Sequence, residues 1–252
     1  MNDDAILTVQ HLDLTFPGEN GGLPTLRDVS FTVKPQEFLS VLGPSGSGKT
    51  TLLRVLAGLL KPSAGSVEIH GPNDKQPRVG LVFEQANLMP WRTVIQNITL
   101  PLELEGVPLA QAQQKAEDLI GLVGLVGFEK AWPRDLSGGM AQRVALARSF
   151  IQQPDLLLLD EPFGSLDALT RERMGTELLN LWHARRTTVI LVTHSIAEAL
   201  MLSDRVLVIS QRPGTVVLEM PVDLPRPRDE EMRYTPTFGA MANQLRAAIG
   251  QS

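Results

Sequence analysis

A glycine-rich segment limits the folds open to this chain more than any other feature of its sequence. The apolar run Phe38–Leu42 precedes it, and Thr51–Leu60 follows with a helical pattern that Lys61-Pro62 ends. A strand, a G-x-x-x-x-G-K-[ST] loop and a helix in this order predict a phosphate-binding loop. The loop consists of Gly43, Pro44, Ser45, Gly46, Ser47, Gly48, Lys49 and Thr50.

The chemistry of this loop suits a nucleotide. Glycines let the backbone turn its N–H groups toward phosphate oxygens, and the N-terminus of the next helix adds a favourable dipole. We expect Lys49 to neutralise the β- and γ-phosphates, Thr50 to ligate Mg²⁺ through its hydroxyl, and Thr51 to belong to the same nucleotide-binding set. The alternative is a Gly/Ser loop that only turns the chain, and the flanking strand and helix disfavour it.

The rest of the chain alternates strand and helix patterns. This alternation predicts an α/β fold with a largely parallel central sheet. A stretch with helical patterns, residues 87–150, interrupts it. Predicted strands are Ile6–Val9, Leu12–Phe16, Val29–Val33, Ser66–His70, Val79–Phe83, Asp155–Asp160, Thr187–Thr193 and Arg205–Ser210. Predicted helices are Leu109–Leu122, Arg171–Ala184, Ile196–Leu202 and Phe238–Ile249.

Composition excludes several kinds of protein. The 252 residues include no cysteine, so disulfides, thiol catalysis and cysteine-based zinc sites are excluded. A net charge of −5 argues against a broad nucleic-acid-binding face, and we expect no nucleic-acid partner. No apolar run reaches the length of a membrane span, and the acidic start Met1–Asp4 does not predict a secretory signal. Work at a membrane would therefore require a partner.

Two acids follow a second apolar run. Leu156–Leu159 leads directly into Asp160, Glu161 and Pro162. A carboxylate at the end of a buried strand is costly unless it meets a cation or hydrogen-bond donors. Asp160 is placed to hold Mg²⁺ through water, and Glu161 to orient and deprotonate a water that attacks the γ-phosphate. Alone, the pair would be read as a charged strand end, but a complete phosphate loop in the same chain makes that reading less favourable.

The segment 136–143, Leu-Ser-Gly-Gly-Met-Ala-Gln-Arg, resembles the signature motif of the ABC ATPases and lies just before the carboxylate strand, as in that family. The resemblance implies that Ser137, Gly138, Gly139 and Gln142 bind nucleotide. The same residues also read as a helix cap, and both readings hold together, because a Ser/Gly helix start is an anion site.

Further matches follow the order of the family. Phe163–Asp167 resembles the loop that contacts the opposing subunit, with Ser165 and Asp167 as contact residues. His194 resembles the switch histidine that senses the γ-phosphate. Phe16 is a candidate for the aromatic that stacks on adenine, with an ordinary core position as the alternative. The ordered set spans about residues 6–228.

The resemblance implies a P-loop NTPase with a mostly parallel central sheet, an N-terminal antiparallel β subdomain and a helical subdomain. Its core would span about residues 1–86 and 151–228, the helical subdomain 87–150, and a tail 229–252. Two subunits, in a homodimer, would pair head to tail around Mg²⁺ and ATP, each ATP lying between one phosphate loop and the other subunit's signature. The dimer would drive membrane-spanning permease subunits from the cytoplasmic face of the membrane.

One position departs from the family, which has a Gln directly after Val-Phe that ligates Mg²⁺ and senses the γ-phosphate. Here Val82-Phe83 is followed by Glu84 and then Gln85. Counting back from Pro90-Trp91 puts Glu84 in the Gln position. Either Glu84 replaces the Gln as a metal ligand, or the loop shifts and Gln85 reaches in.

The branch of the family is indicated by Leu88–Val94, which resembles importers of nitrate, sulfonates, taurine, bicarbonate and related solutes. In that group Leu88, Met89 and Trp91 would dock on a membrane subunit, although Trp91 would equally suit the core of the helical block. A separate periplasmic or extracellular binding protein would select the solute. An exporter ATPase, a non-transport ABC ATPase and a nucleotide-binding module without turnover are the alternatives.

Overall fold

The computed structural model describes residues 5–18, 21–71 and 76–250. Met1–Asp4, where no secretory signal is predicted, lie outside the described residues. The chain divides into two compact units, which are described separately. The first unit is formed by Met1–Gln76 with Thr188–Ser252, and the second by Pro77–Thr187.

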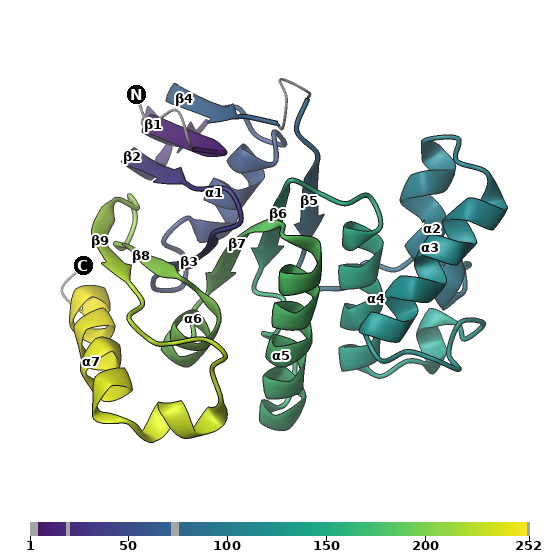
Figure 1. Cartoon of the computed structure of the whole chain (residues 1–252). Coiled ribbons are helices and arrows are strands. Elements are labelled where there is room, and N and C mark those ends of the chain that lie inside the picture. Colours follow the sequence, from purple (N-terminus) through teal and green to yellow (C-terminus); the bar gives the residue numbers. More distant parts are fainter. Residues whose placement is uncertain (1–4, 19–20, 72–75, 251–252) are drawn as a thin grey trace. The chain divides into compact units, whose positions relative to one another are not determined.

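The first unit holds a mainly parallel group of strands: β3 (Phe38–Leu42), β7 (Thr188–Thr193), β8 (Arg205–Ile209) and β9 (Val216–Pro221). Strand β3 pairs in parallel with both β7 and β8, and β9 adds antiparallel to β8. Every residue of β3 and β7 is buried, which is typical of parallel strands covered on both faces. The covering helices are α1 (Lys49–Leu56), α6 (Ile196–Leu202) and α7 (Pro236–Gly250). Figure 1 shows α7 beside α6 and β8.

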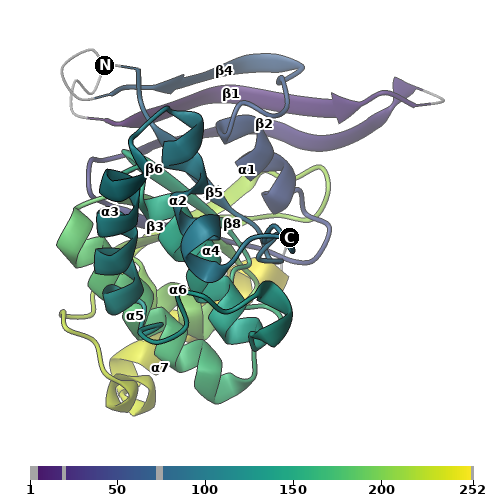
Figure 2. The same cartoon turned by 90° about the vertical axis from the view of Figure 1, so that its right-hand side faces the viewer.

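A second sheet of the same unit is antiparallel, with β1 (Leu7–Phe16) between β2 (Leu23–Val33) and β4 (Ala64–Ile69). Figure 2 shows these three strands side by side. The two strands predicted in residues 6–16 are one strand here. A bulge between Val9 and Leu12, with His11 at φ 48°, breaks the alternation that the prediction relied on.

The second unit combines a parallel pair of strands with four helices. Strands β5 (Val79–Val82) and β6 (Leu156–Asp160) pair in parallel. The helices are α2 (Val94–Leu104), α3 (Leu109–Leu122), α4 (Gly138–Phe150) and α5 (Ala168–Arg185). Helices α2, α3 and α4 pack against one another, and α4 also contacts β5 and α5. The short 3-10 helices η3 (Pro133–Asp135) and η4 (Glu230–Tyr234) belong to the second and first unit respectively.

The predicted α/β class is confirmed, with parallel central strands, an antiparallel N-terminal sheet and helices. Within the described part of the chain, no helix has both the length and the apolar character needed to span a bilayer.

Candidate functional site

The phosphate loop lies at the carboxyl ends of three adjacent strands. Leu42, the last residue of β3, pairs with Thr193 of β7 on one side and Val208 of β8 on the other. Gly43 and His194 therefore leave neighbouring parallel strands at the same edge. This edge is where open α/β sheets bind their ligands.

The backbone of the loop requires glycine at several positions. Gly46 and Gly48 have φ values of 79° and 101°, in the left-handed region that side chains disfavour. A Cβ added at Gly43 would lie 2.6 Å from the carbonyl oxygen of Ile209. The N–H of Leu52 donates to the Gly48 carbonyl, so the loop passes directly into α1. The predicted strand, loop and helix are thus present in order.

Lys49 lies folded over the loop. Its Nζ donates to the carbonyl oxygens of Gly43 and Pro44, at 2.9 Å each, and the residue is only 5% exposed. The loop carbonyls therefore fix the ammonium where the sequence places the phosphates. Thr50 and Thr51 follow in the first turn of α1, both partly buried.

Phe16 and His194 are positioned by strand ends of the first unit. Phe16 ends β1 opposite Leu23 and is half-buried, so it is not a core residue. His194 is exposed. The next residue, Ser195, caps α6 by accepting from the N–H of Glu198. This cap fixes the backbone on the C-terminal side of the histidine.

The acids of the second unit follow its parallel pair. Val82 of β5 pairs with Leu159 of β6, so the residues after both strands leave the same edge. Asp160 is 8% exposed, and Glu161 has a left-handed φ of 46°. A non-glycine residue in this conformation is strained, and such strain concentrates at functional sites.

Glu84 is directed at the turn that follows Glu161. A Cβ built on Gly164 would lie 3.3 Å from Oε1 of Glu84 and 3.4 Å from the carbonyl oxygen of Glu161. The side chain of Glu84 thus reaches the carboxylate loop. Gln85 is exposed next to it.

Two side chains of α4 hold the loop that carries Glu84. The amide of Gln142 donates to the carbonyl of Phe83 at 3.0 Å and is 3% exposed. Arg148 donates to the carbonyls of Ala86 and Asn87, and burial lowers its pKa. In this structure Gln142 therefore acts on the Glu84 loop, and its predicted contact with nucleotide stays a prediction.

The signature segment lies beside the loop after the carboxylate strand. Ser137 caps α4 by accepting from the N–H of Met140, which confirms the predicted cap. A Cβ at Gly139 would lie 2.7 Å from Cγ2 of Thr170, and Gly138 lies close to the side chain of Leu166. These small residues let the two segments approach closely.

The loop after the carboxylate strand ends in a second helix cap. Asp167 caps α5 by accepting from the N–H of Thr170, and hydrogen bonds from Thr170 hold the pKa of Asp167 below its usual range. Ser165, the other predicted contact residue, is exposed. Both side chains are therefore accessible to a partner.

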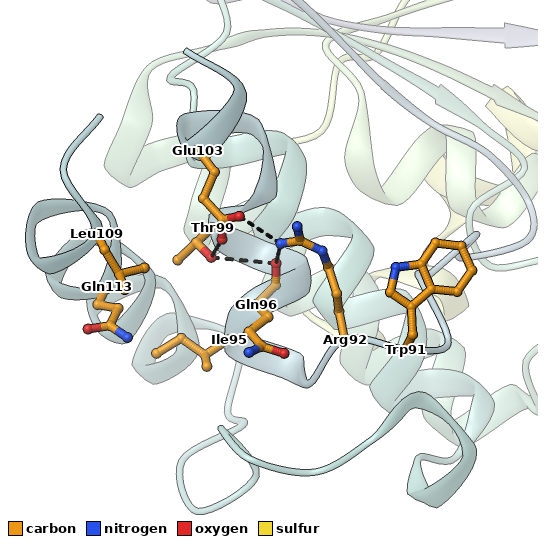
Figure 3. Close-up of a pocket in the computed structure, with 8 residues that line it drawn as sticks. All are labelled: Trp91, Arg92, Ile95, Gln96, Thr99, Glu103, Leu109 and Gln113. Atoms are coloured by element: carbon orange, nitrogen blue, oxygen red, sulfur yellow. Dashed lines mark hydrogen bonds and ion pairs between the residues drawn. The ribbon is translucent and has the colours of Figure 1, made fainter. Parts of the chain in front are cut away.

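The predicted docking segment borders a groove of about 450 Å³. Trp91 is 69% exposed and is not packed in the core, whereas Leu88 and Met89 are half-buried. Figure 3 shows the Arg92 guanidinium pointing toward Glu103, with Nη1 2.8 Å from Oε2. The groove is lined by Trp91, Arg92, Ile95, Gln96, Thr99, Glu103, Leu109 and Gln113.

Sequence reasoning missed Asn97, which organises this segment from inside α2. Its Nδ2 donates to the carbonyls of Met89, Arg92 and Thr93, and its Oδ1 accepts from the N–H of Met89. A fully buried Asn must satisfy its polar atoms internally. The signal in the sequence was an Asn among apolar residues, within the stretch 87–150 that carries helical patterns.

These features define a phosphate-loop nucleotide-binding protein. A glycine-rich loop joins a strand to a helix, Lys49 lies over that loop, and acids follow the end of a parallel strand. Residues 26–164 match the family described as ABC transporter. The chain belongs to this family, as an ATP-binding subunit with ATPase activity.

Individual relatives agree with this assignment. The aliphatic sulfonates import ATP-binding protein of Bacillus subtilis is 42% identical, with 95% of this chain and 92% of the relative covered. The nitrate import ATP-binding protein of Synechocystis sp. is 40% identical, with coverages of 92% and 87%. Among solved structures, a dimeric ATP-binding cassette in a post-hydrolysis state with ADP and Pi has a TM-score of 0.76 at 30% identity, with 87% of this chain and all of that chain covered.

Proposed function

We propose that this chain is the ATP-hydrolysing subunit of an ABC importer for a small solute of the sulfonate, nitrate, taurine or bicarbonate type. The observation that carries the proposal is the formed phosphate loop with Lys49 over it, in a chain whose relatives are import ATP-binding proteins. On this proposal the subunit would lie at the cytoplasmic face of the membrane, peripheral to permease subunits. A periplasmic or extracellular binding protein would select the solute.

The first unit would hold the triphosphate. Lys49 would exchange its contacts with the loop carbonyls for the β- and γ-phosphates, and the loop N–H groups would donate to phosphate oxygens. Thr51, in the first turn of α1, lies on the helix end that favours anions. Phe16 would contribute its half-exposed ring to adenine, and such stacking is worth about 1–3 kcal/mol per base.

The residues also suit Mg²⁺, which the family implies. In the first unit the donor would be the Thr50 hydroxyl, and in the second the carboxylates of Asp160 and Glu84, or the amide oxygen of Gln85. Hydroxyl and carboxylate oxygens are the hard donors that Mg²⁺ prefers. When bound, the ion supplies positive charge that neutralises the phosphates of ATP.

Glu161 would act as the base. Its carboxylate would accept a proton from the attacking water, and its strained backbone is compatible with a position set by function. His194 would donate a hydrogen bond to the γ-phosphate from the end of β7, beside the strand that leads into the phosphate loop, where the α6 cap fixes its backbone. Removal of either side chain would leave the phosphate loop itself unchanged.

Dimerisation would complete each site. The ATP held by Lys49 of one subunit would contact Ser137, Gly138 and Gly139 of the other. Gln142 would join these contacts if its amide released the carbonyl of Phe83. Ser165 and Asp167 are accessible for contacts across the dimer. The dimeric state of the similar cassette structure supports this arrangement.

The groove beside Trp91 would receive the permease. Its lining combines three apolar side chains, Trp91, Ile95 and Leu109, with the Arg92–Glu103 ion pair. Arg92 lowers the pKa of Glu103 through its hydrogen bond, so this pair stays charged at neutral pH. An amphipathic segment of the membrane subunit would match such a surface.

The test is hydrolysis of MgATP by the purified chain, followed by assembly with the membrane subunits of the importer. We expect phosphate release that Lys49→Ala abolishes, because the ammonium over the loop is lost. Reconstituted vesicles should then take up solute only with ATP. An ATPase whose rate is unchanged by Lys49→Ala would contradict the assignment of the loop.

A further inference from the structure

The turn between β8 and β9 lies against the phosphate loop. A Cβ added at Gly214 would lie 2.3 Å from the carbonyl oxygen of Ser47, so this turn and the loop meet at backbone level. The N–H of Gly214 donates to Thr25, and its carbonyl accepts from the N–H of Arg27. The turn is therefore tied to β2 on one side and packed against the phosphate loop on the other.

The turn is also closed internally. The N–H of Ser210 donates to the carbonyl of Thr215 at 2.9 Å, and the N–H of Thr215 donates to Oγ of Ser210 at 3.0 Å. Residues between these two positions have little freedom to move relative to β8. The backbone position from which a side chain of this turn extends is therefore fixed.

Arg212 extends from this turn to the phosphate loop. Its Nε and Nη2 both donate to the carbonyl oxygen of Gly46, each at 3.3 Å. Gly46 lies at the exposed tip of the loop with a left-handed φ of 79°. A planar guanidinium can direct two donors at one oxygen, which fixes orientation as well as position.

The peptide unit that Arg212 contacts also carries the N–H of Ser47. In a trans peptide the C=O and the N–H point in opposite directions, so fixing one fixes the other. The N–H of Ser47 points into the loop and donates to the carbonyl oxygen of Pro44 at 3.3 Å. Such inward N–H groups are what a phosphate loop offers to its ligand.

We propose that Arg212 is a positioning residue of the nucleotide site: it holds the Gly46 carbonyl outward and thereby keeps the Ser47 N–H turned into the loop, where a phosphate oxygen would replace Pro44 as its acceptor. The proposal rests on the proposed nucleotide-binding function. Arg212 acts through the loop and supplies part of the affinity for the triphosphate, while the hydrolytic step depends on other residues.

The experiment compares Arg212→Gln and Arg212→Lys with the unchanged chain by titration with MgATP and by steady-state hydrolysis. Two long hydrogen bonds to an ionised donor predict a rise of about fivefold in Kd and in KM for Arg212→Gln. The kcat at saturating ATP should stay within about twofold, because the chemistry is elsewhere. Arg212→Lys should fall between the two, because an ammonium cannot place the planar pair of donors.

Arg246→Gln is the matched control, because Arg246 is an exposed arginine of α7 that donates to Asn243, three residues before it in the same helix. It should leave Kd unchanged. A Kd for Arg212→Gln equal to that of the unchanged chain overturns the proposal, as does full affinity in Arg212→Lys. A weaker Kd accompanied by a lower melting temperature also counts against it, since that pattern indicates a structural role.

Lys49→Ala separates this inference from the proposed function. If the unchanged chain does not bind ATP, the proposed function fails. If the unchanged chain binds ATP, Lys49→Ala does not, and Arg212→Gln binds normally, only the role of Arg212 fails.

Discussion

Glu84 and Gly164 lie so close that a Cβ at residue 164 would sit 3.3 Å from Oε1 of Glu84. The carboxylate of Glu84 is thereby directed at the loop that follows Glu161. This geometry agrees with the register in which Glu84 takes the place of the family's Gln.

From this geometry we expect Glu84→Gln to keep the ATPase rate level or raise it. The amide retains an oxygen ligand and adds a donor that a carboxylate lacks. Gln85→Ala should change the rate little. Steady-state rates of both variants at saturating MgATP are the measurement. A sharp loss in Gln85→Ala with a silent Glu84→Gln would reverse the assignment, and a large loss in Glu84→Gln would contradict both readings.

Glu161→Gln should bind ATP with near-normal affinity and lose at least about 100-fold in kcat, the usual contribution of a general base. The amide is nearly isosteric, so the strained backbone at φ 46° should persist. Without turnover, the ATP-bound dimer should accumulate and elute earlier from a sizing column. Glu172→Gln, an exchange of the same kind on α5, is the control and should hydrolyse ATP normally. Turnover by Glu161→Gln at the unchanged rate would exclude Glu161 as the base.

Trp91→Ala should weaken assembly with the membrane subunits and leave the ATPase rate of the free subunit unchanged. The ring is 69% exposed at the groove, and an exposed aromatic of this size is typical of an interface anchor. Leu104→Ala is the control, because Leu104 is also on the surface, 81% exposed, and does not line the groove. Co-purification of the complex measures the effect. Equal recovery of both variants would argue that the groove is not the docking site.

Arg228→Met should destabilise the first unit by about 1–3 kcal/mol, the range for a lost hydrogen bond to a charged group with buried partners. Arg228 donates to the carbonyls of Leu200, Ser203 and Leu224, and burial lowers its pKa to about 10. The guanidinium remains protonated at neutral pH, so the contacts are intact there. Denaturant unfolding of the variant beside Arg246→Met checks the value. An unchanged midpoint would mean that water replaces these contacts without loss.

Segments with a clear helical pattern were predictable from the sequence. The predicted bounds of α3 and α6, Leu109–Leu122 and Ile196–Leu202, agree with the structure, because each has a helical pattern with clear ends. Strand β9 (Val216–Pro221) was not predicted, since its pairing with β8 is set by the turn between them and not by its own alternation. The first helix was predicted to run to Leu60, but α1 ends at Leu56. It ends there because Gly58 adopts a left-handed φ of 71° just beyond it.

The motifs of the candidate site were predictable from the sequence, whereas the residues that hold those motifs in place were not. Contiguous motifs named the phosphate loop, the acids and the signature. Gln142 and Arg212 donate to backbone carbonyls 59 and 166 residues away, and only the fold brings those partners together. Asn97 donates to carbonyls of the turn just before its own helix, and no contiguous motif marks that turn. The choice between Glu84 and Gln85 has the same origin, because a shift of one residue redirects the side chain.

Helix α6 is only seven residues long, about 10 Å at 1.5 Å per residue. One end is fixed by Ser195, directly after His194, and the other by Arg228, in the segment that follows β9. A helix with so few turns has little capacity to bend and moves as a rigid element. The backbone on the C-terminal side of His194 is therefore linked through α6 to Arg228, so the residues that follow β9 contribute to the position of the histidine.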